Sequence, residues 1–165
     1  MRKVSRLQDK QWSVVFPLIG LLIVVADQLS KVWIRINLPE GHSLFQVGFF
    51  RITHIHNTGA AFGLFRDQSF ALTIVAIIAI TVILVYTFVG YRHLPWLDSL
   101  SGKLALGLIL GGTVGNLIDR LRFGYVTDFI DFSFWPAFNI ADSAVTVGVT
   151  IFVVSLLLLS PTKKQ

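Results

Sequence analysis

The sequence predicts a mainly α membrane protein with four transmembrane helices, a small extracytoplasmic β-sheet and interfacial segments. Of its 165 residues, 54% are hydrophobic and only 14% are charged. A soluble domain of this length needs more charged surface to stay in solution. Four apolar runs approach the ~20 residues that a membrane-spanning helix requires. These runs cover residues 12–34, 70–91, 104–118 and 141–159.

The first run follows a basic segment, which is a pattern shared by retained helices and cleaved signal peptides. No small-x-small cleavage site closes the run, so we expect a retained helix. Four crossings place both ends of the chain on one side, and that side should hold the lysines and arginines. Basic residues gather at the two ends and in the second connection, namely Arg2, Lys3, Arg6, Lys10, Arg92, Lys103, Lys163 and Lys164. We therefore expect cytoplasmic termini, and we expect the net charge of +5 to orient the protein in a membrane instead of binding nucleic acid.

The first connection on the other side of the membrane should cover about residues 37–68. Within it, residues 44–47 and 49–55 are aromatic and β-branched around Gly48. This pattern predicts two short strands, and residues 57–59 carry a turn signal. A small extracytoplasmic sheet is therefore expected.

The second outer connection should cover about residues 119–139. Residues 60–65 and 132–138 have the amphipathic, aromatic character of segments that rest at the lipid headgroups. No internal repeat or linker divides the chain. We therefore expect a single integral membrane domain over residues 1–165.

Charged residues occur near the outer ends of the apolar runs, where burial in lipid is costly. Asp27 and Lys31 are four residues apart and should form an ion pair on one helix face. Glycines recur every four residues from Gly107 to Gly115, which predicts close helix packing. Asn116, Asp119 and Arg120 follow at helical spacing, so the packed helix should end in a polar group. The arginine alone is as well explained by a side chain that extends to the membrane surface.

Asp128 and Asp142 map to the same membrane level, one just outside the third run and one at the start of the fourth. Two carboxylates brought close together share one proton, so that one takes a proton from water and the other gives one to a carbonyl oxygen. This is aspartic-protease chemistry. Structural roles are also open, because Asp142 suits a helix N-cap and Asp128 suits a turn. Spacing alone does not decide between these interpretations.

Other catalytic groups have weaker support. The chain lacks cysteine, which excludes disulfides, thiolate catalysis and Cys-rich metal sites. His54 and His56 should share one strand face, but no third metal ligand accompanies them, so we expect solvated side chains. Ser30 lies beside Lys31 as in Ser/Lys hydrolases, although pairing with Asp27 would keep the lysine charged and unsuited as a base.

Two other classes of function are weighed against a protease. The intramembrane acids, with Lys31 and Arg120, suit a proton or ion relay. However, these charges lie near one surface, and no broken helix or inverted repeat accompanies them. A lipid-binding scaffold would give the carboxylate pair no purpose.

Five ordered motifs resemble those of bacterial lipoprotein signal peptidase, also called signal peptidase II or prolipoprotein signal peptidase. They are DQLSK (27–31), NTGAAF (57–62), GGTVGNLIDR (111–120), VTDF (126–129) and FNIAD (138–142). Each motif is weak alone, but the set runs from the first apolar run to the last. The chain departs from the family pattern at one place. The segment over residues 129–141 is a few residues shorter than we expect for many members of the family.

This resemblance implies a membrane aspartic endopeptidase, a hydrolase that cuts prolipoproteins just before a diacylglyceryl-modified cysteine. It implies that Asp128 and Asp142 are catalytic. The residues that it assigns to substrate binding or support are Asp27, Lys31, Asn57, Asn116, Asp119, Arg120, Asn139 and Ala141. It further implies a multi-pass protein of the bacterial inner membrane whose active site faces the extracytoplasmic side. Its partners would be membrane lipids and peptide antibiotics such as globomycin; we expect a monomer with no cofactor, metal or nucleic acid.

Overall fold

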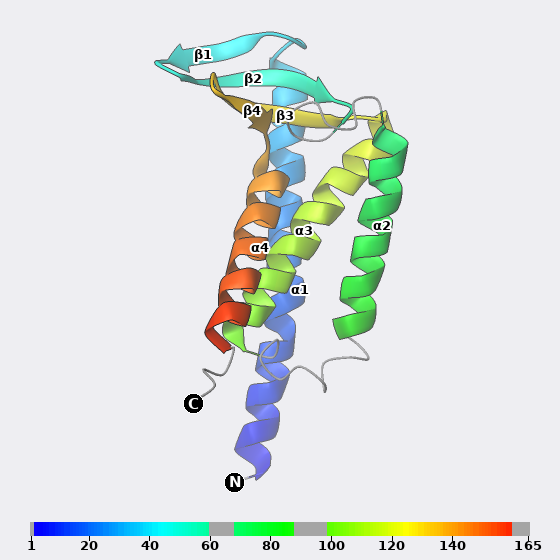
Figure 1. The fold of residues 1–165 in the computed structure, drawn as a ribbon, viewed down its shortest axis with the longest axis vertical. Helices are drawn as coiled ribbons and strands as arrows, with labels where there is room; N and C mark the ends of the chain where they lie inside the picture. The colour runs from blue at the N-terminus through cyan, green and yellow to red at the C-terminus, as the bar shows by residue number, and fades with distance from the viewer. Residues whose placement is uncertain (1, 60–67, 88–98, 160–165) are drawn as a thin grey trace, which may run out of the picture.

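The computed structural model describes residues 2–59, 68–87 and 99–159, and it shows a helical bundle with a β-sheet across one end (Figure 1). The elements are α1 (Arg2–Asn37), β1 (Ser43–Val47), β2 (Phe50–Asn57), α2 (Ser69–Val85), α3 (Leu100–Phe123), β3 (Val126–Phe132), β4 (Trp135–Phe138) and α4 (Ile140–Leu159). The start of α1 and the end of α4 lie at the end of the bundle opposite the sheet (Figure 1). The predicted mainly α fold with a small sheet is confirmed, while residues 60–65 lie outside the described part of the chain.

Three of the described helices are long and apolar enough to cross a bilayer. Their spans are Val14–Asn37, Leu100–Phe123 and Ile140–Leu158. Helix α2 is also apolar but has 17 described residues, which is the lower limit for a spanning helix. Its predicted continuation to residue 91 lies beyond the described residues. Ala76 is the buried residue of α2, so most of this helix faces outward from the bundle.

Helix α3 extends beyond the predicted residues 104–118 at both ends. Ser99 caps its start by accepting a hydrogen bond from the Gly102 N–H, and Gly124, with φ of +79°, ends it. The polar residues near its outer end have partners inside the protein, so their polarity does not stop the helix. Asp119 is therefore a helix residue, and the prediction that the outer connection begins there is wrong.

Helix α3 packs closely against both α1 and α4. A Cβ atom at Gly111 would lie 2.7 Å from the Gly20 carbonyl oxygen of α1. A Cβ atom at Gly112 would lie 2.3 Å from the Ala141 carbonyl oxygen of α4. Only glycine permits these distances, so the predicted packing through small residues is confirmed. The close approach brings the outer ends of three helices together.

The sheet is antiparallel, with the strand order β1-β2-β3-β4. The hairpin of β1 and β2 turns at Gly48, with φ of +59°, and confirms the two predicted strands. The hairpin of β3 and β4 was not predicted, since residues 132–138 were expected to be an interfacial segment and Asp128 part of a connection. Acidic residues are poor strand formers. The strand β3 nevertheless forms because β2 and β4 pair with it on both sides.

The molecule exposes apolar side chains along its helices and buries polar ones at the end that carries the sheet. Exposed leucines, valines and isoleucines cover α1, α2 and α4, as expected for helices in lipid. The buried polar side chains at the sheet-bearing end include Asp27, Lys31, Asn116, Asp119, Thr127, Asp128 and Asn139. Buried charges are tolerated only when they are paired and hydrogen-bonded, so each of these groups needs a partner.

Candidate active site

Lys31 lies at the centre of the buried polar group, with none of its side chain exposed. Its Nζ atom lies 2.8 Å from Asp27 Oδ2 and 3.4 Å from Asp119 Oδ2. It also donates a hydrogen bond of 2.9 Å to Asn116 Oδ1. The expected pairing of Asp27 with Lys31 is therefore present in the structure, but it is extended by a second carboxylate from α3.

Asp27 connects α1 to the N-terminus of α4. Its Oδ1 atom accepts a hydrogen bond of 3.0 Å from the backbone N–H of Ala141, in the first turn of α4. The free N–H groups at a helix start favour a negative charge. The Asp27 carboxylate is therefore stabilised both by the hydrogen bond and by the dipole of α4. Ala141 is fully buried, as its place against Gly112 requires. The carboxylate of Asp27 thereby positions the residue that precedes Asp142.

Asp119 makes the corresponding contact with β3. Its Oδ2 atom accepts a hydrogen bond of 3.0 Å from the backbone N–H of Thr127, the residue that precedes Asp128. Arg35 of α1 supports this contact by donating to Thr127 Oγ1 at 2.9 Å, and it lies 3.5 Å from Asp119 Oδ1. Gln28 Nε2 donates to both Asp27 Oδ2 and Asp119 Oδ1 at 3.2 Å.

The sequence analysis missed three residues of this network: Gln28, Arg35 and Thr127. A signal for two of them was present, because Gln28, Lys31 and Arg35 are three and four residues apart and lie on one helix face. Thr127 gave no such signal, since its role depends on a backbone N–H and on a strand that was not predicted.

Asp142 forms a capping box with Asn139 at the start of α4. The Asp142 N–H donates to Asn139 Oδ1 at 3.0 Å, and the Asn139 N–H donates to Asp142 Oδ2 at 3.2 Å. Asn139 is thus the N-cap, and Asp142 is the third helical residue instead of the cap considered from the sequence. Asn116 Nδ2 donates to the other carboxylate oxygen, Oδ1, at 2.8 Å. Both oxygens of Asp142 are therefore fixed.

Asp128 is held by amide groups from two separate segments and is 1% exposed. Asn57 Nδ2 donates to its Oδ2 at 2.8 Å, and Asn139 Nδ2 donates to its Oδ1 at 2.7 Å. Burial, followed by the nearby negative charge of Asp142, raises the pKa of Asp128 to about 7. A carboxyl group with this pKa retains its proton at a pH where most carboxyl groups have lost theirs.

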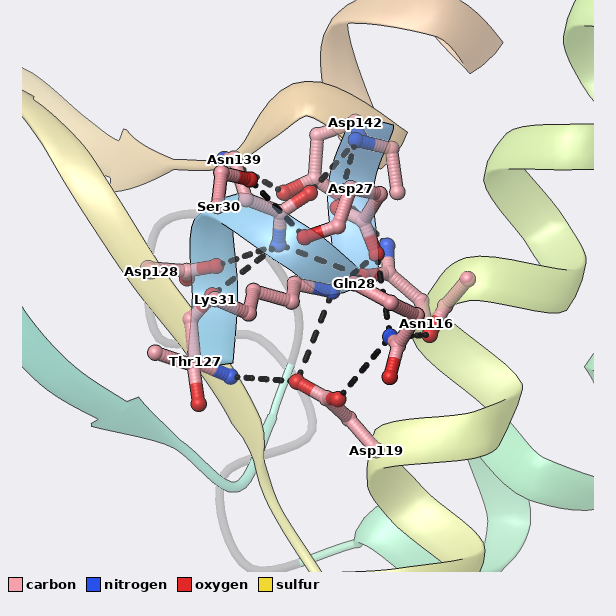
Figure 2. Close-up of polar contacts among 12 residues, drawn as sticks. Asp27, Gln28, Ser30, Lys31, Asn116, Asp119, Thr127, Asp128, Asn139 and Asp142 are labelled. Atoms are coloured by element: carbon pink, nitrogen blue, oxygen red, sulfur yellow. Dashed lines mark hydrogen bonds and ion pairs between the residues drawn. The ribbon is translucent and has the colours of Figure 1, made fainter. Parts of the chain in front are cut away.

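The two asparagines Asn116 and Asn139 connect the carboxyl groups (Figure 2). Asn139 Nδ2 donates to Asn116 Oδ1 at 3.1 Å as well as to Asp128, while Asn116 donates to Asp142. One continuous polar chain therefore joins Asp128 to Asp142. The structure brings together the predicted site residues Asp27, Lys31, Asn57, Asn116, Asp119, Asp128, Asn139, Ala141 and Asp142.

Two adjoining cavities lie beside this chain. The larger, of about 550 Å³, is lined by Asp142, Arg120 and apolar residues of α4 that include Val145 and Val147. The smaller, of about 270 Å³, is lined by Asp128. Asn57 and three further residues line both cavities, so a bound molecule can reach both carboxylates.

Arg120 is partly buried at the wall of the larger cavity. Among the described residues, its guanidinium makes no hydrogen bond or ion pair. The sequence leaves two roles open for it, binding a substrate carbonyl or supporting Asp119, and no hydrogen bond to Asp119 is formed. A cation beside an open cavity is suited to bind an oxygen atom of a ligand. The alternative Ser/Lys chemistry lacks support, because Ser30 Oγ donates to the Asp27 carbonyl and Lys31 lies between carboxylates.

The histidines differ from the prediction of solvated side chains. His54 is buried, and the two rings of His54 and His56 contact each other. Within residues 2–59, 68–87 and 99–159, no three His, Asp or Glu residues are placed to hold a metal ion.

Known proteins resemble this chain over most of its length. Residues 19–158 match the family model described as signal peptidase (SPase) II. The lipoprotein signal peptidase of Dehalococcoides mccartyi strain CBDB1 is 52% identical over 126 residues, which cover 76% of this chain and 78% of that protein. That of Moorella thermoacetica is 47% identical over 144 residues, covering 87% and 93%. A bacterial membrane enzyme solved by the in meso method at 2.3 Å is 32% identical, with a TM-score of 0.79 and 90% of each chain covered.

Proposed function

The chain belongs to the signal peptidase II family and is a membrane protease that removes signal peptides from prolipoproteins, and we propose that Asp128 and Asp142 are its catalytic pair. The observation that carries this proposal is the polar chain through Asn116 and Asn139, which joins the two carboxyl groups beside adjoining cavities. Aspartic peptidases need two such groups with one shared proton.

The proton of the pair belongs on Asp128, whose pKa of about 7 keeps it protonated below neutrality. In the proposed reaction, Asp142 takes a proton from a water molecule, and the water oxygen bonds to the carbon of the scissile peptide. Asp128 gives its proton to the carbonyl oxygen at the same time. The proton held by Asp142 then passes to the departing amine nitrogen as the C–N bond breaks, and Asp128 regains its proton from the hydroxyl of the intermediate.

The surrounding residues suit a substrate that is anchored in lipid. The larger cavity combines the apolar wall of Val145 and Val147 with the guanidinium of Arg120, which has no hydrogen-bond partner in the part of the chain that the structure describes. We propose that apolar parts of the substrate lie against the valines and that Arg120 holds a substrate carbonyl. A cysteine that carries a diacylglyceryl group matches this combination, so we place the cleavage point directly before it.

The proposed location is the outer boundary of the bacterial inner membrane, with cytoplasmic termini. Supporting this, the first residues of α1 and the last of α4 share the end of the bundle opposite the sheet (Figure 1). Of the lysines and arginines predicted to be cytoplasmic, Arg2, Lys3, Arg6 and Lys10 belong to the first part of α1 and Lys103 to the first turns of α3, and both helices begin at that end (Figure 1). We also propose that the protein acts as a monomer and that globomycin-like peptides compete with the substrate for the cavities.

Cleavage of a diacylglyceryl-modified propeptide by protein reconstituted in liposomes tests this function. Asp128→Asn and Asp142→Asn keep the side-chain shape but cannot carry the shared proton, so each should abolish cleavage. Binding of a globomycin-like inhibitor and gel-filtration behaviour would show that each variant is folded. Full turnover by either folded variant would exclude the aspartic mechanism. Ion flux through the liposomes without peptide cleavage would instead support a transporter.

A further inference from the structure

His54 and His56 form a hydrogen-bonded pair at the junction of β2 with the outer end of α1. His54 Nδ1 lies 2.7 Å from the Leu38 carbonyl oxygen, and the two Nε2 atoms lie 3.2 Å apart. His56 Nδ1 lies 3.0 Å from Glu40 Oε1. Leu38 and Glu40 come directly after α1, so the pair connects β2 to the end of the first helix.

The partners of the four ring nitrogens determine how many protons the pair carries. The Leu38 carbonyl only accepts hydrogen bonds, so His54 Nδ1 carries a proton and His54 Nε2 is free to accept. His56 Nε2 must then donate to His54, while His56 Nδ1 must donate to the Glu40 carboxylate. These contacts require three protons on two rings, whereas two neutral imidazoles carry only two. The geometry is therefore that of a pair with one extra proton.

His56 is adjacent in the chain to Asn57, which donates to the carboxylate of Asp128. In the sheet His56 lies opposite Thr127, and Ile55 lies opposite Asp128. The pair thus holds the strand segment that carries the amide partner of Asp128, from the face opposite to that of Asn57.

We infer that His56 is a positioning residue for Asp128, because the singly protonated pair with His54 fixes β2 to the end of α1 and so fixes Asn57. This inference rests on the proposed catalytic role of Asp128. When the pair loses its extra proton, two protons remain for three contacts, so the contact with Leu38, the contact with Glu40 or the contact between the rings must open. Asn57 then holds Asp128 less firmly, and the chemical step slows while substrate binding is retained.

Several groups face His56 and set the pH range of this change. Its side chain is 23% exposed and stacks on Tyr125 at 3.7 Å between ring centroids. Burial lowers the pKa of His56 from its ordinary value of 6.5, and Glu40 opposes this effect, while His54 and Arg35 add to it. The extra proton should therefore leave at a lower pH than it would from an ordinary histidine.

The proton count can be measured directly by NMR on protein with ¹⁵N-labelled histidine. The His54 and His56 rings should show three protonated nitrogens in weakly acidic solution and two at higher pH. Signals are assigned with His56→Phe, which keeps an aromatic ring against Tyr125 but removes both nitrogens. Two protonated nitrogens throughout the range of about pH 5 to 8 would overturn the inference.

The positioning role is tested by the pH dependence of cleavage. In the wild type, kcat should fall about three- to tenfold as the pair loses its proton, with KM little changed. His56→Phe should lack this step and stay at the lower rate. His42→Gln should keep the step, because it changes an exposed side chain whose hydrogen bond goes to the Glu40 backbone carbonyl, and it leaves the backbone contact of residue 42 with His54 in place. A wild-type pH profile in folded His56→Phe protein, with Asp128→Asn inactive, would overturn the inference alone. Turnover by Asp128→Asn would instead overturn the proposed catalytic pair.

Discussion

Asp142 lies in the first turn of a helix, whereas Asp128 lies within a strand, and the two are held by different kinds of contact. Asp142 is fixed largely by its own helix, through the capping box with Asn139. Asp128 depends on amides from residues far away in the sequence, above all Asn57. The two residues nevertheless share one type of supporting contact. A buried aspartate accepts the N–H of the residue before each of them: Asp27 for Asp142, and Asp119 for Asp128.

The comparison shows that Asp142 and Asp128 differ in how strongly their positions depend on a single buried aspartate. The helix start retains its capping box when Asp27 is changed, so local contacts still define Asp142. Asp128 has no capping box of this kind among the described contacts, and the residue before it is held by Asp119 and Arg35. The strand side should therefore be the more sensitive of the two.

The largest expected effect comes from Lys31, which serves both supports. Lys31→Met leaves Asp27 and Asp119 as buried carboxylates without their shared cation, which should cost about 3–5 kcal/mol of stability. The loss is measured as a lowered midpoint of thermal or denaturant unfolding in detergent. The double variant Asp27→Asn/Lys31→Met should regain part of it, because Asp119 keeps Gln28 and Arg35. A double variant as unstable as the sum of the two single changes would show that Lys31 does not act through this pairing.

The next prediction compares the effects of changing Asp119 and Asp27 on the rate of cleavage. Asp119→Asn should lower kcat about 10- to 100-fold, since the strand loses the charge that fixes Thr127. Asp27→Asn should lower it less, because the capping box remains. The measurement is cleavage of the lipidated propeptide under saturating conditions. Equal losses in the two variants would remove the distinction between helix and strand supports.

The smallest effect concerns stability and pH. The pKa of Asp128 is raised from 3.8 to about 7 on folding, so its contribution to stability is full below pH 3.8 and is lost as the pH rises through 7. Asp128→Asn should therefore flatten the fall in unfolding temperature between these values, and kcat of the wild type should decrease above pH 7. Asp142→Asn should cost about 1 kcal/mol through its weakened capping box, and, because it removes the charge that helps raise the pKa of Asp128, it should also make the fall in unfolding temperature smaller. A pH dependence of stability that survives in Asp128→Asn would assign it to another group.

Sequence reasoning reached some of these features because their cause is local. The spacing of Asp27 and Lys31 predicted their pairing, and Gly48 between aromatic segments predicted the first hairpin. The proximity of Asp128 and Asp142 depends on tertiary packing, so it came from the family resemblance and not from spacing. The place of Asp142 at the start of the last helix was expected from the sequence, whereas the strand context of Asp128 came only from the structure.

Other features were beyond sequence reasoning for physical reasons. The strand β3 contains acidic residues that propensity places in loops, and it is stabilised by two neighbouring strands. The supports of Asp27 and Asp119 act on backbone N–H groups, which every residue other than proline possesses. The pairing of His54 with His56 required the Leu38 carbonyl, which no side-chain pattern reports.

The ion pair of Asp27 and Lys31 forms within a single helix, so it does not depend on any later part of the chain. During synthesis α1 emerges before α3, and an unpaired lysine or aspartate within a spanning helix opposes insertion, by about 2.5–3.5 kcal/mol where it lies at the helix centre. The acid and the base offset each other before α3 and its Asp119 have been translated. The first helix can therefore enter the bilayer on its own, and the same lysine later pairs with Asn116 and Asp119 when α3 packs against it.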